Sequence, residues 1–149
     1  DGHPRQRTPR HFTPVYNAGL VRDATEVKSL IDNPMVQIVD ARAAGRFEGT
    51  AAEPRASLRS GHIPSSRNLP FASLINPDGT LKPASELRQI FAAAKVNPDR
   101  PVIASCGSGV TACHHLLAMA HAGLHGARLY TGSWSGWIED PARPVATGD

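Results

Sequence analysis

Short apolar runs alternate along this sequence with segments in which apolar residues recur every three or four positions. The runs are typical of buried strands, and they lie at 20–21, 36–39, 68–71, 102–105 and 128–130. The periodic segments predict helices at 23–31, 84–95 and 110–124, with a short helical piece at 46–47. Such an alternation without an internal repeat indicates a mostly parallel sheet covered by helices on both faces. The predicted fold class is therefore α/β, in three α/β/α layers.

The ends and faces of the predicted helices follow from individual residues. Asp23 and Glu26 fit a capping box at the start of the first helix, and Asn-Pro at 33–34 ends it. Gly-Ser-Trp at 132–134 predicts a turn. In the last long helix we expect one apolar stripe to face the core, consisting of Val110, Cys113, Leu117, Ala120 and Leu124.

The two ends of the chain lack this periodicity. Residues 1–17 contain three prolines and predict a linker or extended arm, and the polar residues 141–149 predict a C-terminal tail. A single domain over 18–140 lies between them, in a chain of 149 residues that is long enough for one core. Because the chain begins with Asp, we expect it to be a fragment or a processed product.

Composition excludes several classes of protein. The net charge of +3 comes with a basic start, and it is too weak to argue for a nucleic-acid partner. The sequence contains no apolar run of membrane-spanning length and no secretory signal pattern. The only two cysteines, Cys106 and Cys113, would lie about 10 Å apart on a helix, too far for a disulfide. Two free thiols favour a reducing compartment, and we expect the cytoplasm.

One of these cysteines stands where the strand 102–105 is expected to meet the last long helix. Cys106 opens the sequence Cys-Gly-Ser-Gly, residues 106–109. The first N–H groups of a helix have no helical partner, and the helix dipole is positive there. We expect a thiol at this place to lose its proton easily and to act as a nucleophile. Asp40, Asn68 and Thr131 also follow predicted strands, so they should share one rim of the sheet with Cys106.

Three functions are considered for this loop, namely dinucleotide binding, phosphate ester hydrolysis and sulfur transfer. Residues 107–112 match the dinucleotide fingerprint G-x-G-x-x-A, but the next strand ends in Tyr130-Thr131, without the acidic residue that binds a ribose. A cysteine phosphatase needs an arginine six positions after the cysteine, where this chain has Ala112. The third is sulfur transfer, because a loop of N–H donors can hold a Cys–S–S⁻ persulfide as it holds other anions. Sulfur transfer requires no metal and no organic cofactor.

A series of motifs resembles the rhodanese superfamily. The loop 106–112, Cys-Gly-Ser-Gly-Val-Thr-Ala, is similar to the active-site loop of this family in the form seen in 3-mercaptopyruvate sulfurtransferases. The other motifs follow the family's order and are Asp40-Ala-Arg42 with Gly45-Arg-Phe47, Glu53-Pro-Arg55, Gly61-His-Ile-Pro64, and Tyr130-x-Gly-Ser-Trp134-x-x-Trp137. Together they are highly specific and cover most of the chain. The resemblance implies a rhodanese-like α/β/α fold.

The resemblance also implies site residues. Cys106 would be the nucleophile that carries the persulfide, and Ser108 would handle or polarise a proton. Arg46 and Arg55 would grip the carboxylate and carbonyl of the substrate, and a guanidinium is a natural fork for a carboxylate. The remaining substrate-binding residues would be those of the loop, Gly107, Gly109, Val110 and Thr111. The implied reaction moves a sulfane sulfur from 3-mercaptopyruvate to a thiol acceptor such as thioredoxin or glutathione, or to cyanide.

Two alternatives to this reaction stay open. Thiosulfate-preferring members carry cationic side chains where Gly107 and Ser108 stand, so the neutral loop favours mercaptopyruvate over the doubly charged thiosulfate. The other alternative is a non-catalytic domain that carries sulfur or binds a partner. Members with this loop usually have two rhodanese domains, and this chain resembles the second one without its N-terminal partner domain. The chain departs from the family at Ser65-Ser66, Thr131 and Gly136, where Gly-Ala, Asp and Glu are usual.

Other residues invite structural interpretations. We expect Arg42 to form an ion pair with Asp40, His62 to serve a turn, and Cys113 to be a small buried hydrophobe. Zinc binding is not expected, because no third ligand accompanies the i, i+4 histidine pair. We expect four histidines on the surface, namely His114, His115, His121 and His125. The two tryptophans are expected in the core or in a cleft wall, namely Trp134 and Trp137.

Overall fold

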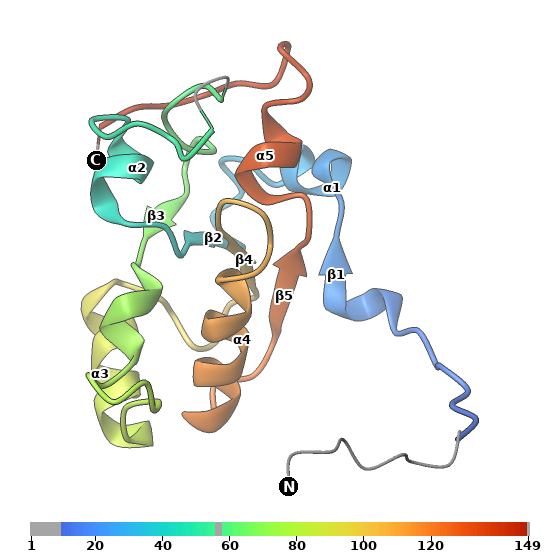
Figure 1. Cartoon of the computed structure of the whole chain (residues 1–149), viewed down its shortest axis with the longest axis vertical. Helices are drawn as coiled ribbons and strands as arrows, with labels where there is room; N and C mark the ends of the chain where they lie inside the picture. The colour runs from blue at the N-terminus through green and yellow to red at the C-terminus, as the bar shows by residue number, and fades with distance from the viewer. Residues whose placement is uncertain (1–9, 56–57, 149) are drawn as a thin grey trace, which may run out of the picture.

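The computed structural model describes residues 10–55 and 58–148 (Figure 1). Residues 1–9 of the predicted arm and residue 149 of the predicted tail lie outside this description. The strands are β1 (Val21–Arg22), β2 (Gln37–Asp40), β3 (Arg67–Asn68), β4 (Val102–Ser105) and β5 (Ala127–Tyr130). The helices are α1 (Ala24–Ser29), α2 (Ala44–Glu48), α3 (Ala84–Ala93), α4 (Ala112–His121) and α5 (Ser133–Trp137), with 3-10 helices η1 (Ala18–Leu20) and η2 (Phe71–Leu74).

These five strands form one parallel sheet in the order β1-β5-β4-β2-β3. The predicted α/β class with a parallel sheet is therefore confirmed. The central strand β4 pairs with β2 on one side, where Asp40 is in register with Ser105, and with β5 on the other. Because parallel strands end at the same edge of a sheet, the residues that follow β2, β4 and β5 meet at one rim.

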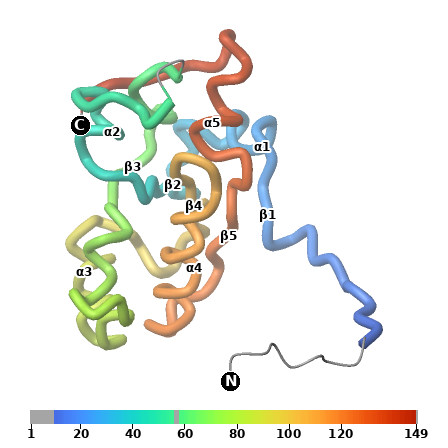
Figure 2. The backbone as a smooth tube through the Cα atoms, in the orientation of Figure 1, coloured from blue at the N-terminus to red at the C-terminus, as the bar shows by residue number. Residues whose placement is uncertain are grey.

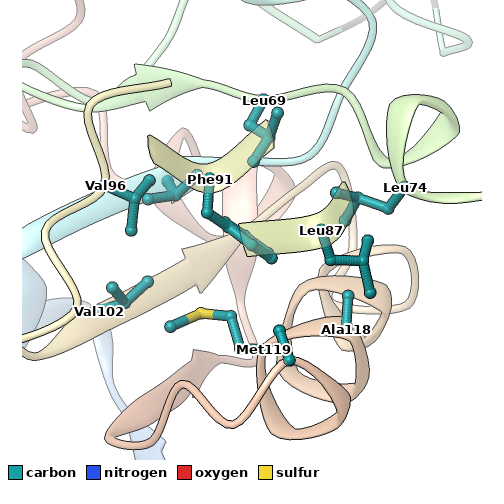
Figure 3. Close-up of a cluster of buried hydrophobic side chains, with 10 residues drawn as sticks. Leu69, Leu74, Leu87, Phe91, Val96, Val102, Ala118 and Met119 are labelled. Carbon is teal, nitrogen blue, oxygen red and sulfur yellow. The ribbon is translucent and has the colours of Figure 1, made fainter. Parts of the chain in front are cut away.

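Helices cover both faces of the sheet. One hydrophobic cluster lies between the sheet and the helices α3 and α4, and includes Leu87, Phe91 and Met119 (Figure 3). Each of these three side chains is at most 1% exposed. The cluster joins the two long helices to one side of the sheet and so fixes the direction in which α4 leaves the end of β4.

A second hydrophobic cluster lies on the opposite face, under α1 and α5. It includes Val27 of α1 and both tryptophans of α5, Trp134 and Trp137, which are 1% and 0% exposed. Neighbouring residues of β2 point to opposite clusters, Ile38 to this one and Val39 to the other, as the alternation of side chains along a strand requires. The tryptophans thus lie in the core, as expected.

The capping box at the start of α1 is confirmed. The Asp23 carboxylate accepts from the Glu26 N–H at 2.8 Å, and the Glu26 carboxylate accepts from the Asp23 N–H at 2.9 Å. The expected turn at 132–134 is wrong in its extent, because Ser133 already begins α5. Among the described residues, none of the helices has the length and apolar character needed to cross a membrane.

The two ends of the chain differ in their contacts. Residues 10–16 lead away from the rest of the chain (Figure 2), and Phe12 and Val15 are 81% and 91% exposed. The C-terminal segment instead returns to the fold, because Ala146 and His62 exchange two backbone hydrogen bonds of 2.8 and 3.0 Å. The buried His62 ring stacks on Phe47 with ring centroids 3.8 Å apart. His62 is therefore a structural residue, as expected.

The apolar stripe that we expected to face the core is wrong except for Leu124, which is partly buried against the cluster under α3 and α4. Val110 and Leu117 are 70% and 59% exposed, and Cys113 is exposed as well, so it is not a buried hydrophobe. The helix begins only at Ala112, and a different face, with the same helical period, packs inward. That buried face consists of Ala112, His115, Ala118 and Met119. Its alanines allow the close approach of η2 and the sheet, whereas leucines of higher hydropathy dominated the sequence pattern.

The expected surface position of His115 is also wrong. Its side chain is fully buried on α4, and its Nε2 lies 2.8 Å from the Leu69 carbonyl oxygen, so Nε2 carries the proton in the neutral ring. Burial lowers the pKa of His115 to about 4, although the hydrogen bond to Leu69 and the charge of Asp40 oppose this shift. The ring is therefore neutral in the folded chain at neutral pH.

We expect His115 to make the chain less stable in weak acid. The unfolded chain binds this proton near pH 6.5 and the folded chain only near pH 4, so stability is lost as the pH falls through this interval. The loss amounts to about 3 kcal/mol. Urea unfolding at pH 7 and pH 4 should show this loss for the wild type and a smaller one for His115→Gln. An equal loss in both proteins would exclude His115 as its source, and His121→Gln, on the exposed end of α4, serves as the control.

Candidate active site

Cys106 stands directly after β4, at the carboxyl edge of the sheet. The residue is 1% exposed, and its backbone N–H donates to the Ser133 hydroxyl at 3.0 Å. The oxygen of that hydroxyl lies 3.9 Å from Cys106 Sγ and 2.9 Å from the Tyr130 carbonyl oxygen. The first residue of α5 is thereby tied both to the cysteine and to the end of the neighbouring strand β5.

The carbonyl groups of the loop are held by the first turn of α5. The Trp134 N–H donates to the Cys106 carbonyl oxygen at 2.9 Å. Ser135 donates to the Gly107 carbonyl oxygen through its N–H at 2.9 Å and through its hydroxyl at 2.8 Å. With these carbonyls engaged by α5, the loop presents N–H groups to the cysteine sulfur, and such a set of donors favours an anion.

These donors determine how easily the Cys106 thiol ionises. Burial raises its pKa, but hydrogen bonds from the Thr111 hydroxyl, from the N–H groups of Ala112 and Ser108, and from the Ser133 hydroxyl outweigh burial. The net effect is a pKa below the usual value of 9.0. A lower pKa raises the thiolate fraction at neutral pH, and the thiolate is the reactive form of the side chain. The sequence-based expectation of an easily ionised thiol thus agrees with the surroundings of Cys106.

Two glycines of the loop leave little room for a side chain, and at Gly109 a side chain would collide with backbone. Gly109 has a φ of +84°, and a Cβ atom there would lie 2.7 Å from the Thr131 carbonyl oxygen. A Cβ atom on Gly107 would lie 3.0 Å from Nη2 of Arg46. Gly109 therefore permits the loop to pack against the end of β5, and Gly107 allows the Arg46 guanidinium to approach the loop.

An open cavity of about 220 Å³ leads to Cys106. Seven of the eight residues proposed from the sequence line it, namely Arg46, Arg55, Cys106, Gly107, Ser108, Val110 and Thr111. Gly109 is not at the cavity wall, because it is buried against Thr131. The structure thus collects residues from α2, from the segment around Arg55 and from the loop around one thiol.

A chain of ion pairs connects this cavity to the rim of the sheet. Arg42, whose side chain is fully buried, contacts Asp40 at 2.7 Å and Glu53 at 2.9 Å. Glu53 in turn contacts Arg46 at 2.6 Å. The Arg42 guanidinium carbon also lies 4.8 Å from the centre of the Trp134 ring. The predicted ion pair between Arg42 and Asp40 is confirmed, and it is part of a larger network with two positive and two negative charges.

The sequence interpretation gave no role to three residues of this site. Glu53 appeared only as part of the motif Glu53-Pro-Arg55. Its position between Arg46 and Arg55 in the sequence was the signal of an ion pair. Ser133 appeared only within an expected turn, and Ser135 only at an unspecified position of the motif that ends in Trp137. Their hydroxyls bond to Cys106 and Gly107, and this could not be read from the sequence because the partners lie 27 and 28 positions apart.

Metal binding finds no support in the part of the chain that the structure describes. No group of three or more histidine, cysteine, aspartate or glutamate side chains in residues 10–55 and 58–148 is arranged to hold a metal ion. The cavity instead joins an easily ionised thiol with guanidinium groups. Such an arrangement suits nucleophilic attack on an anionic small molecule.

Comparison with known proteins gives a family match over most of the chain. A model of the rhodanese-like domain matches residues 23–140. A Thiosulfate/3-mercaptopyruvate sulfurtransferase 1, mitochondrial, of Arabidopsis thaliana is 39% identical over 93% of this chain and 36% of its own length. A probable 3-mercaptopyruvate sulfurtransferase of Pseudomonas aeruginosa is 43% identical over 95% of this chain and 49% of its own length. The chain thus spans about half the length, or less, of these curated relatives.

Solved structures with a similar fold are also longer than this chain. The crystal structure of the Tum1 protein from Saccharomyces cerevisiae is 32% identical, with a TM-score of 0.77, over 87% of this chain and 47% of the other. A structure of EanB in complex with hercynine has a TM-score of 0.87 at 21% identity over the whole of this chain. At that identity the likeness to EanB concerns the fold alone.

Proposed function

The chain belongs to the family of rhodanese-like domains, and on this premise we propose that it is a sulfurtransferase that carries sulfur as a persulfide on Cys106. The observation that carries the proposal is one cavity that joins a thiol of lowered pKa to the Arg46 guanidinium. The curated relatives carry names of sulfurtransferases that use 3-mercaptopyruvate or thiosulfate. We propose 3-mercaptopyruvate as the preferred sulfur donor.

The proposed reaction begins with attack of the Cys106 thiolate on the sulfur of 3-mercaptopyruvate. The new S–S bond forms as the C–S bond breaks, and the electron pair of that bond leaves on pyruvate as its enolate. The enolate takes the thiol proton of the substrate, through Ser108 or water, and becomes pyruvate. The loop N–H groups stabilise the persulfide anion. A thiol such as that of thioredoxin or glutathione, or cyanide, then removes the outer sulfur and restores the thiolate.

The charges around the cavity favour this donor over thiosulfate. The cavity is lined by two arginines, Arg46 and Arg55, and by two negative groups, Glu53 and the Cys106 thiolate, so these charges balance. The loop itself supplies the uncharged residues Gly107 and Ser108. A singly charged keto acid matches this balance better than a dianion, whose second charge would find no cation of its own.

The alternative function is that of a sulfur carrier or a partner-binding domain. The relatives extend beyond the matched region, so a further rhodanese domain that completes the cavity remains part of the proposal. The cytoplasm is our proposed compartment, although the Arabidopsis relative is named as mitochondrial.

Steady-state turnover with cyanide as the acceptor tests the proposed donor. We expect the chain to release pyruvate from 3-mercaptopyruvate with a kcat/KM at least about tenfold above that for release of sulfite from thiosulfate. A preference for thiosulfate would reverse the donor assignment. If the chain turns over neither donor, it is a sulfur carrier or its site needs a further domain. Adding the N-terminal rhodanese domain of a relative would restore turnover only in the second case.

The Arg46 guanidinium is expected to bind the carboxylate of the donor. We predict that Arg46→Met raises KM for 3-mercaptopyruvate about 10- to 100-fold, which corresponds to the loss of one charge-assisted hydrogen bond. The value of kcat should change much less, because the arginine binds the donor throughout the reaction. Arg22→Met is the matched control, because the Arg22 side chain is 28% exposed, pairs with Glu26 at 3.8 Å and does not line the cavity. An unchanged KM in Arg46→Met would remove Arg46 from the binding site.

A further inference from the structure

The guanidinium of Arg46 is held along one of its edges by Glu53. Arg46 Nε donates to Glu53 Oε1 at 3.2 Å, and Arg46 Nη2 donates to Glu53 Oε2 at 2.6 Å. This pair of bonds occupies two of the five N–H groups of the arginine. Nη1 and the second proton of Nη2 are the donors that remain for a ligand, and Nη2 lies beside Gly107 of the loop. The Glu53 carboxylate thus leaves only the Nη1–Nη2 edge of Arg46 for a bound anion.

Glu53 is itself fixed from behind. Its side chain is 1% exposed, and its Oε1 also accepts from Arg42 Nη1 at 2.9 Å. Arg42 cannot swing away, because it bonds to Asp40 at 2.7 Å and to the Gly61 carbonyl oxygen at 2.9 Å. Arg46 is therefore connected to Asp40, the last residue of β2, through three ion pairs, and two of them are buried.

The ion pair with Glu53 orders the Arg46 side chain before a ligand binds. Arg46 is 27% exposed and carries a long side chain, which loses several rotatable bonds when it is ordered. An arginine that is ordered before the ligand arrives avoids this entropic cost at the moment of binding. The structure places that ordering contact inside the cavity wall, since Glu53 and Arg46 both line it.

We propose that Glu53 is a positioning residue for the donor, acting through Arg46; this rests on the proposed function. Glu53 accepts from arginines with both of its oxygens, so it holds the guanidinium rather than touching the reacting sulfur. It presents the Nη1–Nη2 edge of Arg46 to the donor carboxylate. Its loss frees Arg46 to adopt other rotamers and weakens donor binding, while Cys106 keeps its own hydrogen bonds to the loop and to Ser133.

The test is a double-mutant cycle on formation of the Cys106 persulfide. Wild type, Glu53→Gln, Arg46→Met and the double variant are mixed with increasing 3-mercaptopyruvate, and intact mass gives the rate of sulfur gain at each concentration. We expect Glu53→Gln to raise the half-saturating concentration about tenfold or more, with the saturating rate within about threefold of wild type. In the Arg46→Met background the same change should have an effect below about twofold. Glu48→Gln, at the end of α2, controls for the lost negative charge.

Each outcome of this cycle is decisive. An equal effect of Glu53→Gln with and without Arg46, or an effect on the saturating rate alone, would mean that Glu53 acts on the fold or on Cys106 and would overturn the positioning role. An unchanged half-saturating concentration in Glu53→Gln would overturn it as well. A wild-type chain that gains no sulfur from 3-mercaptopyruvate would instead contradict the proposed function on which the role rests. Thermal unfolding of all four proteins shows whether a loss of binding reflects loss of the fold.

Discussion

Replacement of Cys106 by serine is expected to abolish turnover. The serine hydroxyl has nearly the same size, so the hydrogen bonds of the loop to Ser133 and to the first turn of α5 can persist. A hydroxyl, however, stays protonated at neutral pH and cannot form a persulfide. Pyruvate release from 3-mercaptopyruvate with cyanide as the acceptor should fall by about 1,000-fold or more.

Cys113 provides the matched control for this substitution. It is the other cysteine of the chain, it lies one position after the start of α4, and it is exposed. Its thiol lies 3.4 Å from the Gly109 carbonyl oxygen, outside the cavity wall. Cys113→Ser should therefore retain turnover within about twofold of wild type. Residual turnover in Cys106→Ser that disappears only when Cys113 is also replaced would show that the wrong thiol had been assigned.

Substitution of Gly109 by alanine is expected to have the second largest effect. A non-glycine residue at a φ of +84° costs about 1–2 kcal/mol. The added Cβ would also lie 2.7 Å from the Thr131 carbonyl oxygen, and backbone at this distance must move. The loop would shift away from β5 and carry the N–H donors of the Cys106 thiolate with it. We predict that the rate of persulfide formation falls about 100-fold, together with a rise in the pKa of the Cys106 thiol.

Gly123 allows the clash to be separated from the backbone strain. It has a φ of +74°, but a Cβ atom there would meet nothing within 4 Å. Gly123→Ala thus shares the strain of Gly109→Ala and lacks its collision. The alkylation rate of Cys106 as a function of pH, measured with iodoacetamide, reports the thiol pKa in both variants. A Gly109→Ala protein with the thiol pKa and the loading rate of Gly123→Ala would show that the loop tolerates the side chain.

The fold could be predicted from the sequence where local signals agreed with packing. The apolar run 102–105 is β4 residue for residue, and Asp23 with Glu26 forms the expected capping box. Prediction failed for the buried face of α4. The leucines gave the stronger hydropathy signal, but the core of that face accepts small alanines and His115. Which of two helical faces packs inward depended on its neighbours in space, and the sequence does not display these.

The site residues that belong to sequence motifs could be predicted. Cys106, Arg46 and Arg55 came from motifs that the resemblance supplied, and the structure brings them to one cavity. Contacts between distant segments were the part that the sequence could not supply. The hydrogen bonds of Ser133 and Ser135 to the loop, and the position of Glu53 between Arg42 and Arg46, depend on how β5, α5 and α2 meet around the end of β4.

The most direct test of the central claim is the intact mass of the purified chain before and after incubation with 3-mercaptopyruvate, and separately with thiosulfate. We predict a gain of one sulfur atom that maps to the peptide containing Cys106, that dithiothreitol removes, and that forms faster from 3-mercaptopyruvate. A chain whose mass stays unchanged with both donors, or whose added sulfur maps to Cys113, would contradict the assignment of Cys106 as the persulfide carrier.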